Sequence, residues 1–320
     1  LAAYGESNVV IQACVGEGNT PTLPGEPQEP DFPIVIPSGA VYTYMFEDLW
    51  PLYGDYDMND VVFKLSDFTT YVSTNNQVGR FEFDLTLLAV GASYDIGLAM
   101  QLDQTPASNI RSVTYTSSTI ADYIPYVNAF LRDETTGVEK DEPYAVIPLA
   151  NEVHTLFHKT WFINTVESRP DGAMAPVTIH VKVDFATPVD PLQLNINNLN
   201  FFIMSKVDLY KVDNANGVRR REVHLAGYQP TAKADTKIFG NHNDNSINGQ
   251  YTYVSNDGLA WAIAVPAEVR WMNEWTRITE GYLQLKNWMQ GELDAETGRA
   301  IQWWEPNGTN MDESKLYTQP

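Results

Sequence analysis

The sequence is organised around the stretch Phe46-Glu47-Asp48-Leu49-Trp50-Pro51-Leu52-Tyr53-Gly54-Asp55-Tyr56-Asp57-Met58-Asn59-Asp60-Val61-Val62-Phe63. Residues 47–60 of it carry six carboxylate or amide side chains, and the first Lys or Arg of the chain is Lys64. The flanking runs, 41–46 and 60–65, are rich in β-branched and aromatic residues, which favour strands. The stretch therefore predicts two strands joined by an acidic loop.

Further strands are expected from the same signals along the chain. Residues 79–87 alternate polar and apolar side chains with a period of two, and the runs at 113–116, 177–185 and 200–204 repeat the pattern. Short strands separated by Gly, Pro and Asn predict an all-β or β-dominated fold, an antiparallel, jelly-roll-like β-sandwich. Only a few short helices are expected, at 151–158 and at 279–289, where Thr279 precedes Glu280 as a cap.

Two domains of unequal character are predicted. Residues 17–40 hold six prolines among Gly, Thr and Glu, which indicates an extended spacer, so residues 1–39 are interpreted as a Pro-rich acidic arm. Residues 41–320 are interpreted as one β-rich domain. Its tryptophan-rich end could form a second layer, or a C-terminal subdomain from about residue 206.

The overall composition limits the partners. The chain has 320 residues and a net charge of -21, which argues against binding nucleic acid or an anionic membrane through a basic face. No run of about 18 apolar residues exists, so no transmembrane span is predicted in this chain. The single cysteine, Cys14, excludes an internal disulfide and a cysteine-based zinc site.

The acidic loop is the candidate metal site. Asp55, Asp57 and Asn59 occupy every second position, so in extended backbone their side chains fall on one side. Ca²⁺ prefers six to eight such hard oxygen ligands. The candidate structural Ca²⁺ ligands are Glu47, Asp48, Asp55, Asp57, Asn59 and Asp60. The alternative, that these side chains cap turns by accepting backbone N–H bonds, remains open.

The loop starts like an EF-hand but departs from it, since Asp60 and Ser66 stand where that loop needs Gly and Glu. The pattern Phe46-Glu47-Asp48-x-Trp50-Pro51-x-x-Gly54-Asp55-x-Asp57-x-Asn59-Asp60-Val61-Val62 resembles the signature of the LruC-domain family of Gram-negative bacteria. The resemblance continues at 91–97, 222–231 and 258–266, and covers about residues 41–305. It implies a secreted or lipid-anchored surface protein, a β-rich fold and a calcium loop, with no established enzymatic activity.

Other polar motifs are weaker candidates. His154 and His158 have the i, i+4 spacing of a zinc clamp, although a packed helix face explains two histidines beside Leu and Phe equally well. The oxygen-rich run 241–249 is interpreted as a solvated loop rich in Asx turns, or as a source of remote ligands. The basic run 219–221 is interpreted as a solvated turn rather than an anion site.

The expected function is that of a non-enzymatic cell-surface module with a structural Ca²⁺ loop, serving adhesion or the binding of a surface glycan or protein. It would be secreted or anchored to the outer membrane of a Gram-negative bacterium. The alternative is a carbohydrate-directed protein, either a glycan-binding module or a glycoside hydrolase. For that alternative, Trp271, Trp303 and Trp304 are expected to be exposed, whereas Trp261 between Leu259 and Ile263 is expected to be buried.

Overall fold

The computed structural model describes residues 32–121, 123, 130–158, 161–205, 220–306 and 310–318. Residues 32–320 form one compact unit. Most of the predicted arm, with Cys14, lies outside the described residues. Its end does not, because Ile34–Pro37 forms strand β1 and pairs with residues 69–72. The β structure thus begins before the predicted boundary, since the β-branched run at 34–36 finds a partner strand.

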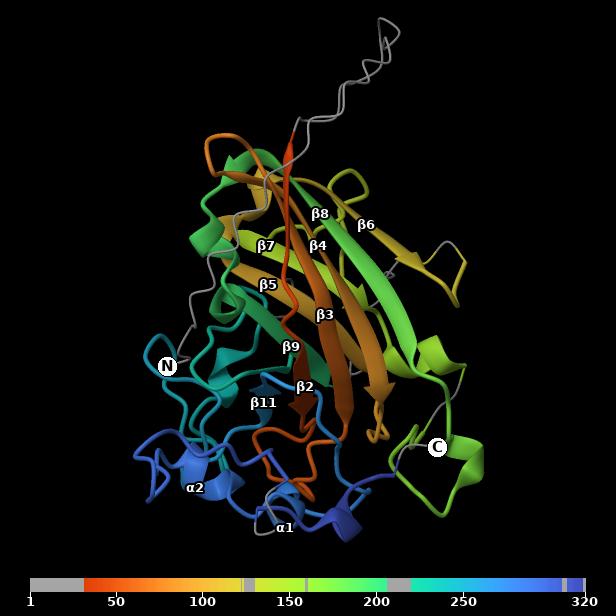
Figure 1. The fold of residues 1–320 in the computed structure, drawn as a ribbon, viewed down its shortest axis with the longest axis vertical. Helices are drawn as coiled ribbons and strands as arrows, with labels where there is room; N and C mark the ends of the chain where they lie inside the picture. The colour runs from red at the N-terminus through yellow and green to blue at the C-terminus, as the bar shows by residue number, and fades with distance from the viewer. Residues whose placement is uncertain are drawn as a thin grey trace, which may run out of the picture. The chain divides into compact units, whose positions relative to one another are not determined.

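Two antiparallel sheets pack as a sandwich, so the predicted fold class is confirmed (Figure 1). The first sheet has seven strands in the order β11-β2-β3-β4-β8-β6, with β1 added to β3. The second has four in the order β10-β9-β5-β7. Besides β1, the first sheet contains β2 (Tyr42–Phe46), β3 (Val61–Val72), β4 (Val78–Ala89), β6 (Ile110–Ser117), β8 (Val177–Val189) and β11 (Ala262–Val265). The second contains β5 (Ile96–Pro106), β7 (Tyr144–Ala150), β9 (Leu199–Ser205) and β10 (Glu222–His224).

Aromatic side chains fill the space between the two sheets. Tyr44 of β2 stacks on Phe63 of β3 with ring centroids 4.8 Å apart, and Phe201 of β9 meets Phe63 at 5.4 Å. On β4 the burial alternates residue by residue, as the period-two pattern predicts. Each predicted strand is present, and the one expected at 60–65 continues as far as Val72.

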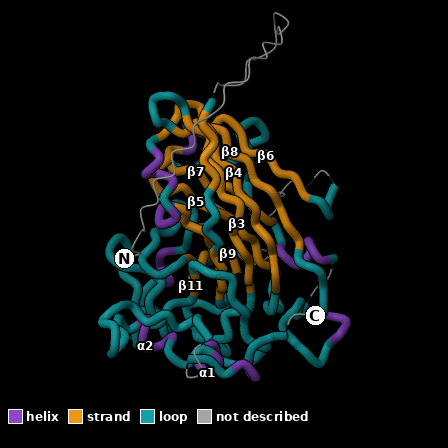
Figure 2. Tube along the Cα trace, viewed as in Figure 1, coloured by secondary structure: helices purple, strands orange, loops and turns teal. Residues whose placement is uncertain are grey.

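The first sheet is also covered on its other face. Tyr44 and Phe46 face the core between the sheets, whereas Met45 lies in a second cluster with Trp271, Met272 and other C-terminal residues. These C-terminal residues, from about Leu259 to Tyr317, are called the C-terminal layer below. The layer is mostly loop (Figure 2). Because the middle of the sheet is buried on both faces, its strands carry apolar residues at successive positions.

The helices are short and differ from the prediction. The helix expected at 279–289 is two helices, α1 (Ile278–Gly281) and α2 (Leu285–Met289), and Arg277 rather than Thr279 precedes α1, without a side-chain cap. The helix breaks because the N–H of Leu283 donates to Asn310 O, a tertiary partner. The remaining helices are of the 3-10 type: η1 (Ala107–Asn109), η2 (Val153–Phe157), η3 (Pro170–Gly172), η4 (Pro191–Leu194), η5 (Ile196–Asn198), η6 (Thr236–Ile238) and η7 (Glu313–Lys315).

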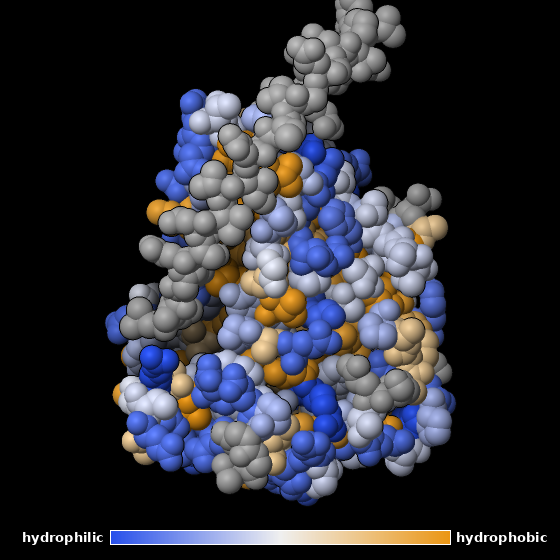
Figure 3. All heavy atoms as spheres, viewed as in Figure 1, coloured by the Kyte–Doolittle hydropathy of each residue, from blue (hydrophilic) through white to orange (hydrophobic). Residues whose placement is uncertain are grey.

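The face drawn in Figure 3 has a mixed surface, in which apolar side chains form separate patches between polar ones. Among the described residues, the exposed apolar side chains include Ile34, Val35 and Ile36 of β1. Exposed apolar residues are common on the surface of folded proteins, and this short run by itself marks no site.

Candidate metal centre

The hairpin register brings the two ends of the acidic loop together. Phe46 of β2 pairs with Val61 of β3 in antiparallel register. Glu47, which follows β2, and Asp60, which precedes β3, therefore lie side by side. The N–H of Asp48 donates to Oδ2 of Asp60 at 2.7 Å and closes the loop. In Figure 1 this loop and the C-terminal segment lie at the same end of the first sheet.

The middle of the loop alternates its backbone conformation. Gly54, Tyr56 and Met58 have φ of 60°, 58° and 58°, in the left-handed region. Tyr56 and Met58 are buried in the C-terminal layer, while Asp57 between them lies in the acidic group. Left-handed non-glycine residues are unfavourable and cluster at functional sites. At Gly54 a side chain is excluded, because a Cβ there would lie 2.6 Å from Oε1 of Glu47.

The structure brings the predicted carboxylates together in two groups of three. Oxygens of Glu47, Asp48 and Asp60 lie within 4.8 Å of one another, and so do oxygens of Glu47, Asp55 and Asp57. The sixth predicted residue, Asn59, is fully buried beside them and its Nδ2 donates to Met272 O. These residues together with Glu274 are called the acidic cluster below.

Burial without hydrogen bonds distinguishes Glu47 from an ordinary loop carboxylate. Its side chain is 0% exposed, and within the described residues neither of its oxygens has a hydrogen-bond partner. The same is true of Oδ1 of Asn59. Leaving such acceptors buried and unsatisfied costs on the order of 1–3 kcal/mol each, and more for a charged group. The set therefore needs a donor or a cation.

Sequence reasoning missed Glu274, which comes from the C-terminal layer. Its N–H donates to Thr165 O at 2.8 Å, and the next N–H, of Trp275, donates to Oδ2 of Asp57 at 2.9 Å. Gly91 makes room for it, since a Cβ there would lie 2.7 Å from Oε2 of Glu274 and 1.9 Å from Oδ1 of Asn59. Nothing local in the sequence marks Glu274 as part of this site.

Turn capping explains part of the cluster. Asp57 accepts from the N–H of Asn59 at 3.1 Å and from that of Trp275 at 2.9 Å, and Asp60 accepts from that of Asp48. These are the backbone contacts that the alternative interpretation requires. Burial nevertheless raises the pKa of Asp60 well above its usual value. Capping leaves Glu47 unexplained.

The cluster strongly disfavours negative charge. Burial raises the pKa of Glu47 well above its usual value, and Asp57, Asp48 and Asp55 raise it further, whereas the nearby Leu49 amide, the smallest of these influences, lowers it. Burial also raises the pKa of Glu274 to about 8. A bound divalent cation would reverse these shifts, because it supplies the opposite charge that the residues lack.

The histidine pair does not form a zinc clamp. His154 is buried on η2, where Nδ1 contacts Oε1 of Glu152 at 2.5 Å and Nε2 contacts Ala92 O at 2.8 Å. Both ring nitrogens are thus engaged, and His158 is exposed in a left-handed conformation after the helix. The packed-face interpretation of His154 fits these contacts.

The run 241–249 packs against the acidic loop and forms hydrogen bonds with it. Its Asp244 is buried rather than solvated, and it accepts from Nε1 of Trp50 at 3.1 Å and from Oγ of Ser246 at 2.6 Å. The N–H of Asn243 donates to Pro51 O at 3.1 Å. The run contributes Asx-type turns, as predicted, and holds residues 50–53 in place.

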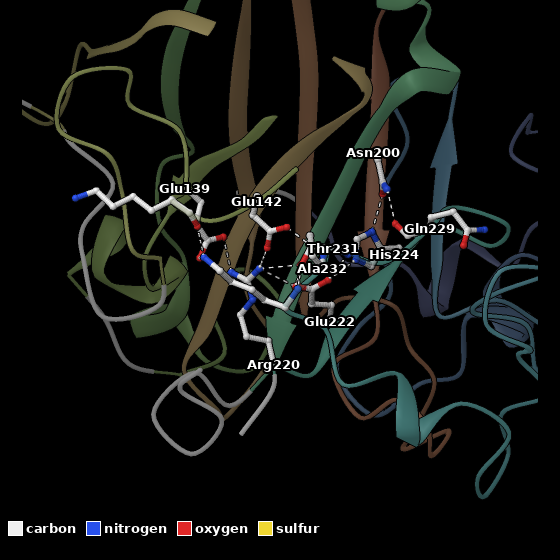
Figure 4. Close-up of polar contacts among 11 residues, drawn as sticks. Glu139, Glu142, Asn200, Arg220, Glu222, His224, Gln229, Thr231 and Ala232 are labelled. Atoms are coloured by element: carbon white, nitrogen blue, oxygen red, sulfur yellow. Dashed lines mark hydrogen bonds and ion pairs between the residues drawn. The ribbon is translucent and has the colours of Figure 1, made fainter. Parts of the chain in front are cut away.

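Of the basic run 219–221, Arg219 lies outside the described residues, and the solvated-turn interpretation is wrong for Arg220. Arg220 is 2% exposed and contacts Glu139 at 2.6 Å, Glu142 at 3.2 Å and Glu222 at 3.0 Å (Figure 4). The strand pairing of β9 and β10 and the return of the chain at residue 231 bury it. These residues, with His224, Thr231 and Lys233, are called the arginine network below.

The tryptophan expectations are partly wrong. Trp261 is fully buried as expected, but Trp271 and Trp303 are each only 1% exposed, because the C-terminal layer uses them as core. The most exposed tryptophans in the described part of the chain are Trp161 at 59% and Trp275 at 65%.

Comparison with known families identifies a match to most of the chain. The family described as "Domain of unknown function (DUF4842)" matches residues 76–303. The chain belongs to this family. The DUF4842 match begins after the acidic loop and includes Gly91 and Glu274, so the candidate site combines residues from before and within the matched region. The LruC name of the resemblance does not appear among the matches, and stays a prediction.

Among curated proteins none matches the chain. Among solved structures, the chain is similar to a crystal structure described as that of a "Putative lipoprotein from Bacteroides ovatus", with a TM-score of 0.62 and 18% sequence identity. The alignment covers 89% of this chain and 76% of that one. At this identity the likeness establishes a shared fold. Within the described ranges, no helix is both long and apolar enough to cross a membrane.

Proposed function

We propose that this protein is a non-enzymatic cell-surface module, serving adhesion or ligand binding, whose acidic cluster binds Ca²⁺ as a structural ion. The observation that carries the proposal is Glu47, fully buried with two oxygens that lack hydrogen-bond partners within the described residues. Further carboxylate oxygens lie within 4.8 Å of it. Hard oxygen ligands of this kind are what Ca²⁺ prefers.

The ligands would come from three parts of the fold. Glu47 and Asp60 lie where β2 ends and β3 begins, Asp55 and Asp57 lie in the loop between them, and Glu274 belongs to the C-terminal layer. When bound, the ion supplies positive charge that none of these residues provides. It would tie the loop to both neighbours and fix the local surface for presentation.

Thermal unfolding of metal-stripped protein tests the proposal. Ca²⁺ at a hundredfold excess over Kd adds about 2.7 kcal/mol to the free energy of unfolding. We expect a clear rise in Tm that Mg²⁺ does not reproduce and that Asp57→Ala reduces. The control is Glu268→Gln, an exposed acid outside the cluster, which should keep the full rise. Equal Tm values with and without Ca²⁺ would leave turn capping as the role of these acids.

The cell-surface location is supported by the name of the structural neighbour and by the LruC resemblance. Proteolysis of intact producing cells tests it directly. The chain should be degraded by external protease while a cytosolic protein in the same cells stays intact. Survival of the chain under these conditions would contradict the proposed location.

A glycan-directed function is the second candidate, favoured by the exposed aromatic group near the cluster. Trp275, 65% exposed, packs edge-on against Phe162 with centroids 5.5 Å apart. Its N–H donates to Asp57, so ion binding and the position of this ring would be linked. Trp275→Ala should weaken binding on a glycan array at least tenfold under this candidate. Turnover of chromogenic glycosides would contradict the non-enzymatic proposal.

A further inference from the structure

The acidic cluster is divided in two by its geometry. Oxygens of Glu47, Asp48 and Asp60 form one group within 4.8 Å of one another, and oxygens of Glu47, Asp55 and Asp57 form a second. Ligands bind Ca²⁺ at about 2.3–2.6 Å, so oxygens on opposite sides of one ion lie about 4.6–5.2 Å apart. Each group of three therefore has the span of one coordination sphere. The five acids form two such groups that share Glu47.

We propose that the acidic cluster holds two Ca²⁺ ions side by side, bridged by the carboxylate of Glu47. The proposal rests on the proposed Ca²⁺ function and deepens it. One ion lies with Asp48 and Asp60 at the junction of β2 and β3, and the other lies with Asp55 and Asp57 in the loop.

The Glu47 side chain suits a bridging role. It is fully buried, and both of its oxygens lack hydrogen-bond partners among the described residues, so both are available for ligation. Oε1 faces the middle of the loop, since a Cβ at Gly54 would lie 2.6 Å from it. One oxygen for each ion accounts for the two missing partners at once.

The charge of the cluster also fits two ions better than one. Within the described residues, no basic side chain forms an ion pair with Glu47, Asp55, Asp57, Asp60 or Glu274. With Asp48 the cluster has six acids, which carry six negative charges when ionised. One Ca²⁺ leaves a net charge of about -4 in the cluster, whereas two leave about -2.

Additional oxygens converge at Gly91, from Asn59, whose N–H donates to Asp57 of the loop group, and from Glu274 of the C-terminal layer. Oδ1 of Asn59 and Oε2 of Glu274 both approach Gly91, where a Cβ would lie 1.9 Å and 2.7 Å from them. Both atoms are buried acceptors without a hydrogen-bond partner in the described residues. Asp57, whose carboxylate is held by the N–H of Trp275, joins this side to the C-terminal layer. The loop ion would thus fasten the C-terminal layer to the sheet, and the other ion would fasten β2 to β3.

Native mass spectrometry of the whole chain, titrated with Ca²⁺ after metal stripping, tests the stoichiometry. We expect two specifically bound ions in the wild-type protein, one in Asp60→Asn and one in Asp55→Asn. Glu47→Gln should weaken the binding of both ions, and calorimetry should show an affinity for Ca²⁺ at least tenfold lower. Glu268→Gln, which changes an exposed acid, should keep two. Ions bound nonspecifically to the acidic surface contribute equally to all variants, so the differences in ion count between variants report only the specific sites.

The outcomes separate this inference from the proposed function. One bound ion, lost in both Asp55→Asn and Asp60→Asn, would overturn the bridged pair while leaving the Ca²⁺ function intact. No bound ion would overturn both. If Glu47→Gln fails to fold, the two aspartate variants still decide the count, and Asp55 is only half-buried, so Asp55→Asn keeps its packing.

Discussion

Two regions of this chain bury acidic side chains and compensate them differently. In the arginine network, Glu139, Glu142 and Glu222 surround Arg220, and Lys233 adds a second cation to Glu139. In the acidic cluster, the carboxylates lie against one another and against backbone N–H groups. Both regions are within the same compact unit and both are shielded from water.

The pKa values express this difference. Burial tends to raise the pKa of Glu222, but Arg220 and the hydrogen bond from His224 lower it to about 2. Burial raises the pKa of Glu274 to about 8, and the neighbouring Asp55 adds to the effect. Burial acts in the same direction on both carboxyl groups, so for Glu222 and Glu274 the difference in counter-charge sets the sign of the shift. The arginine network carries its own cations, and the acidic cluster takes its cation from solution under our proposal.

The largest effect is expected from removing the internal cation. Arg220→Met leaves three glutamates buried without their guanidinium and should lower the free energy of unfolding by about 3–5 kcal/mol. Denaturant unfolding at neutral pH measures it. Arg169→Met, which removes an exposed ion pair with Asp171, is the control and should change stability by less than about 1 kcal/mol. A similar small loss for both variants would break the comparison.

A change of sign is expected for the acidic cluster. Without Ca²⁺, Asp57→Asn should leave stability unchanged or raise it, because it removes one of several repelling charges. With Ca²⁺ at a hundredfold excess over Kd, it should forfeit up to about 2.7 kcal/mol of ion-dependent stability. Glu222→Gln should be destabilising in both conditions. Denaturant midpoints with chelator or with Ca²⁺ report these differences, and destabilisation by Asp57→Asn in chelator would contradict the expectation.

Stability should depend on pH in opposite directions through Glu274 of the acidic cluster and Glu222 of the arginine network. A raised carboxyl pKa stabilises the folded protein below the unfolded value of about 4.5, and this contribution is lost as pH rises towards 8 for Glu274. For Glu222 the contribution is present above about 4.5 and is lost as pH falls through about 2.

Unfolding of the metal-stripped protein at pH 5 and at pH 8 measures the first of these contributions. We expect a loss on the order of 2 kcal/mol between the two values, and Ca²⁺ should reduce it. Glu142, whose pKa is raised to about 7, contributes to the pH dependence in the same direction. The variant Glu274→Gln is therefore needed to isolate the contribution of Glu274. An unchanged pH dependence in Glu274→Gln would remove Glu274 from the account.

The smallest effect on stability is expected from filling the space at Gly91, which lies against Asn59 of the acidic loop and Glu274 of the C-terminal layer. Gly91→Ala places a Cβ against Asn59 and Glu274, and should cost about 1–2 kcal/mol and weaken Ca²⁺ binding about tenfold. Gly39→Ala, where no atom lies within 4 Å of the added Cβ, is the matched control. Calorimetric titration of both variants measures the affinities, and equal values would mean that Gly91 is not part of the site.

Local patterns in the sequence predicted the elements that depend on neighbouring residues. The alternation in 79–87 gave the position of β4, and the acidic loop was placed correctly between β2 and β3, because strand register follows from side-chain alternation. The helix expected at 279–289 was broken by a hydrogen bond from Leu283 to Asn310. Such a partner cannot be read from a local period.

The amino-acid order alone was sufficient for the sandwich class and for the concentration of acids at 47–60, since both depend on composition and spacing along a short segment. Tertiary structure decided which carboxylates would be paired. It placed Arg220 among Glu139, Glu142 and Glu222. It also brought Glu274 and Gly91 to the acidic loop. The energy of a buried charge depends on neighbours from distant segments, and only the folded chain specifies those neighbours.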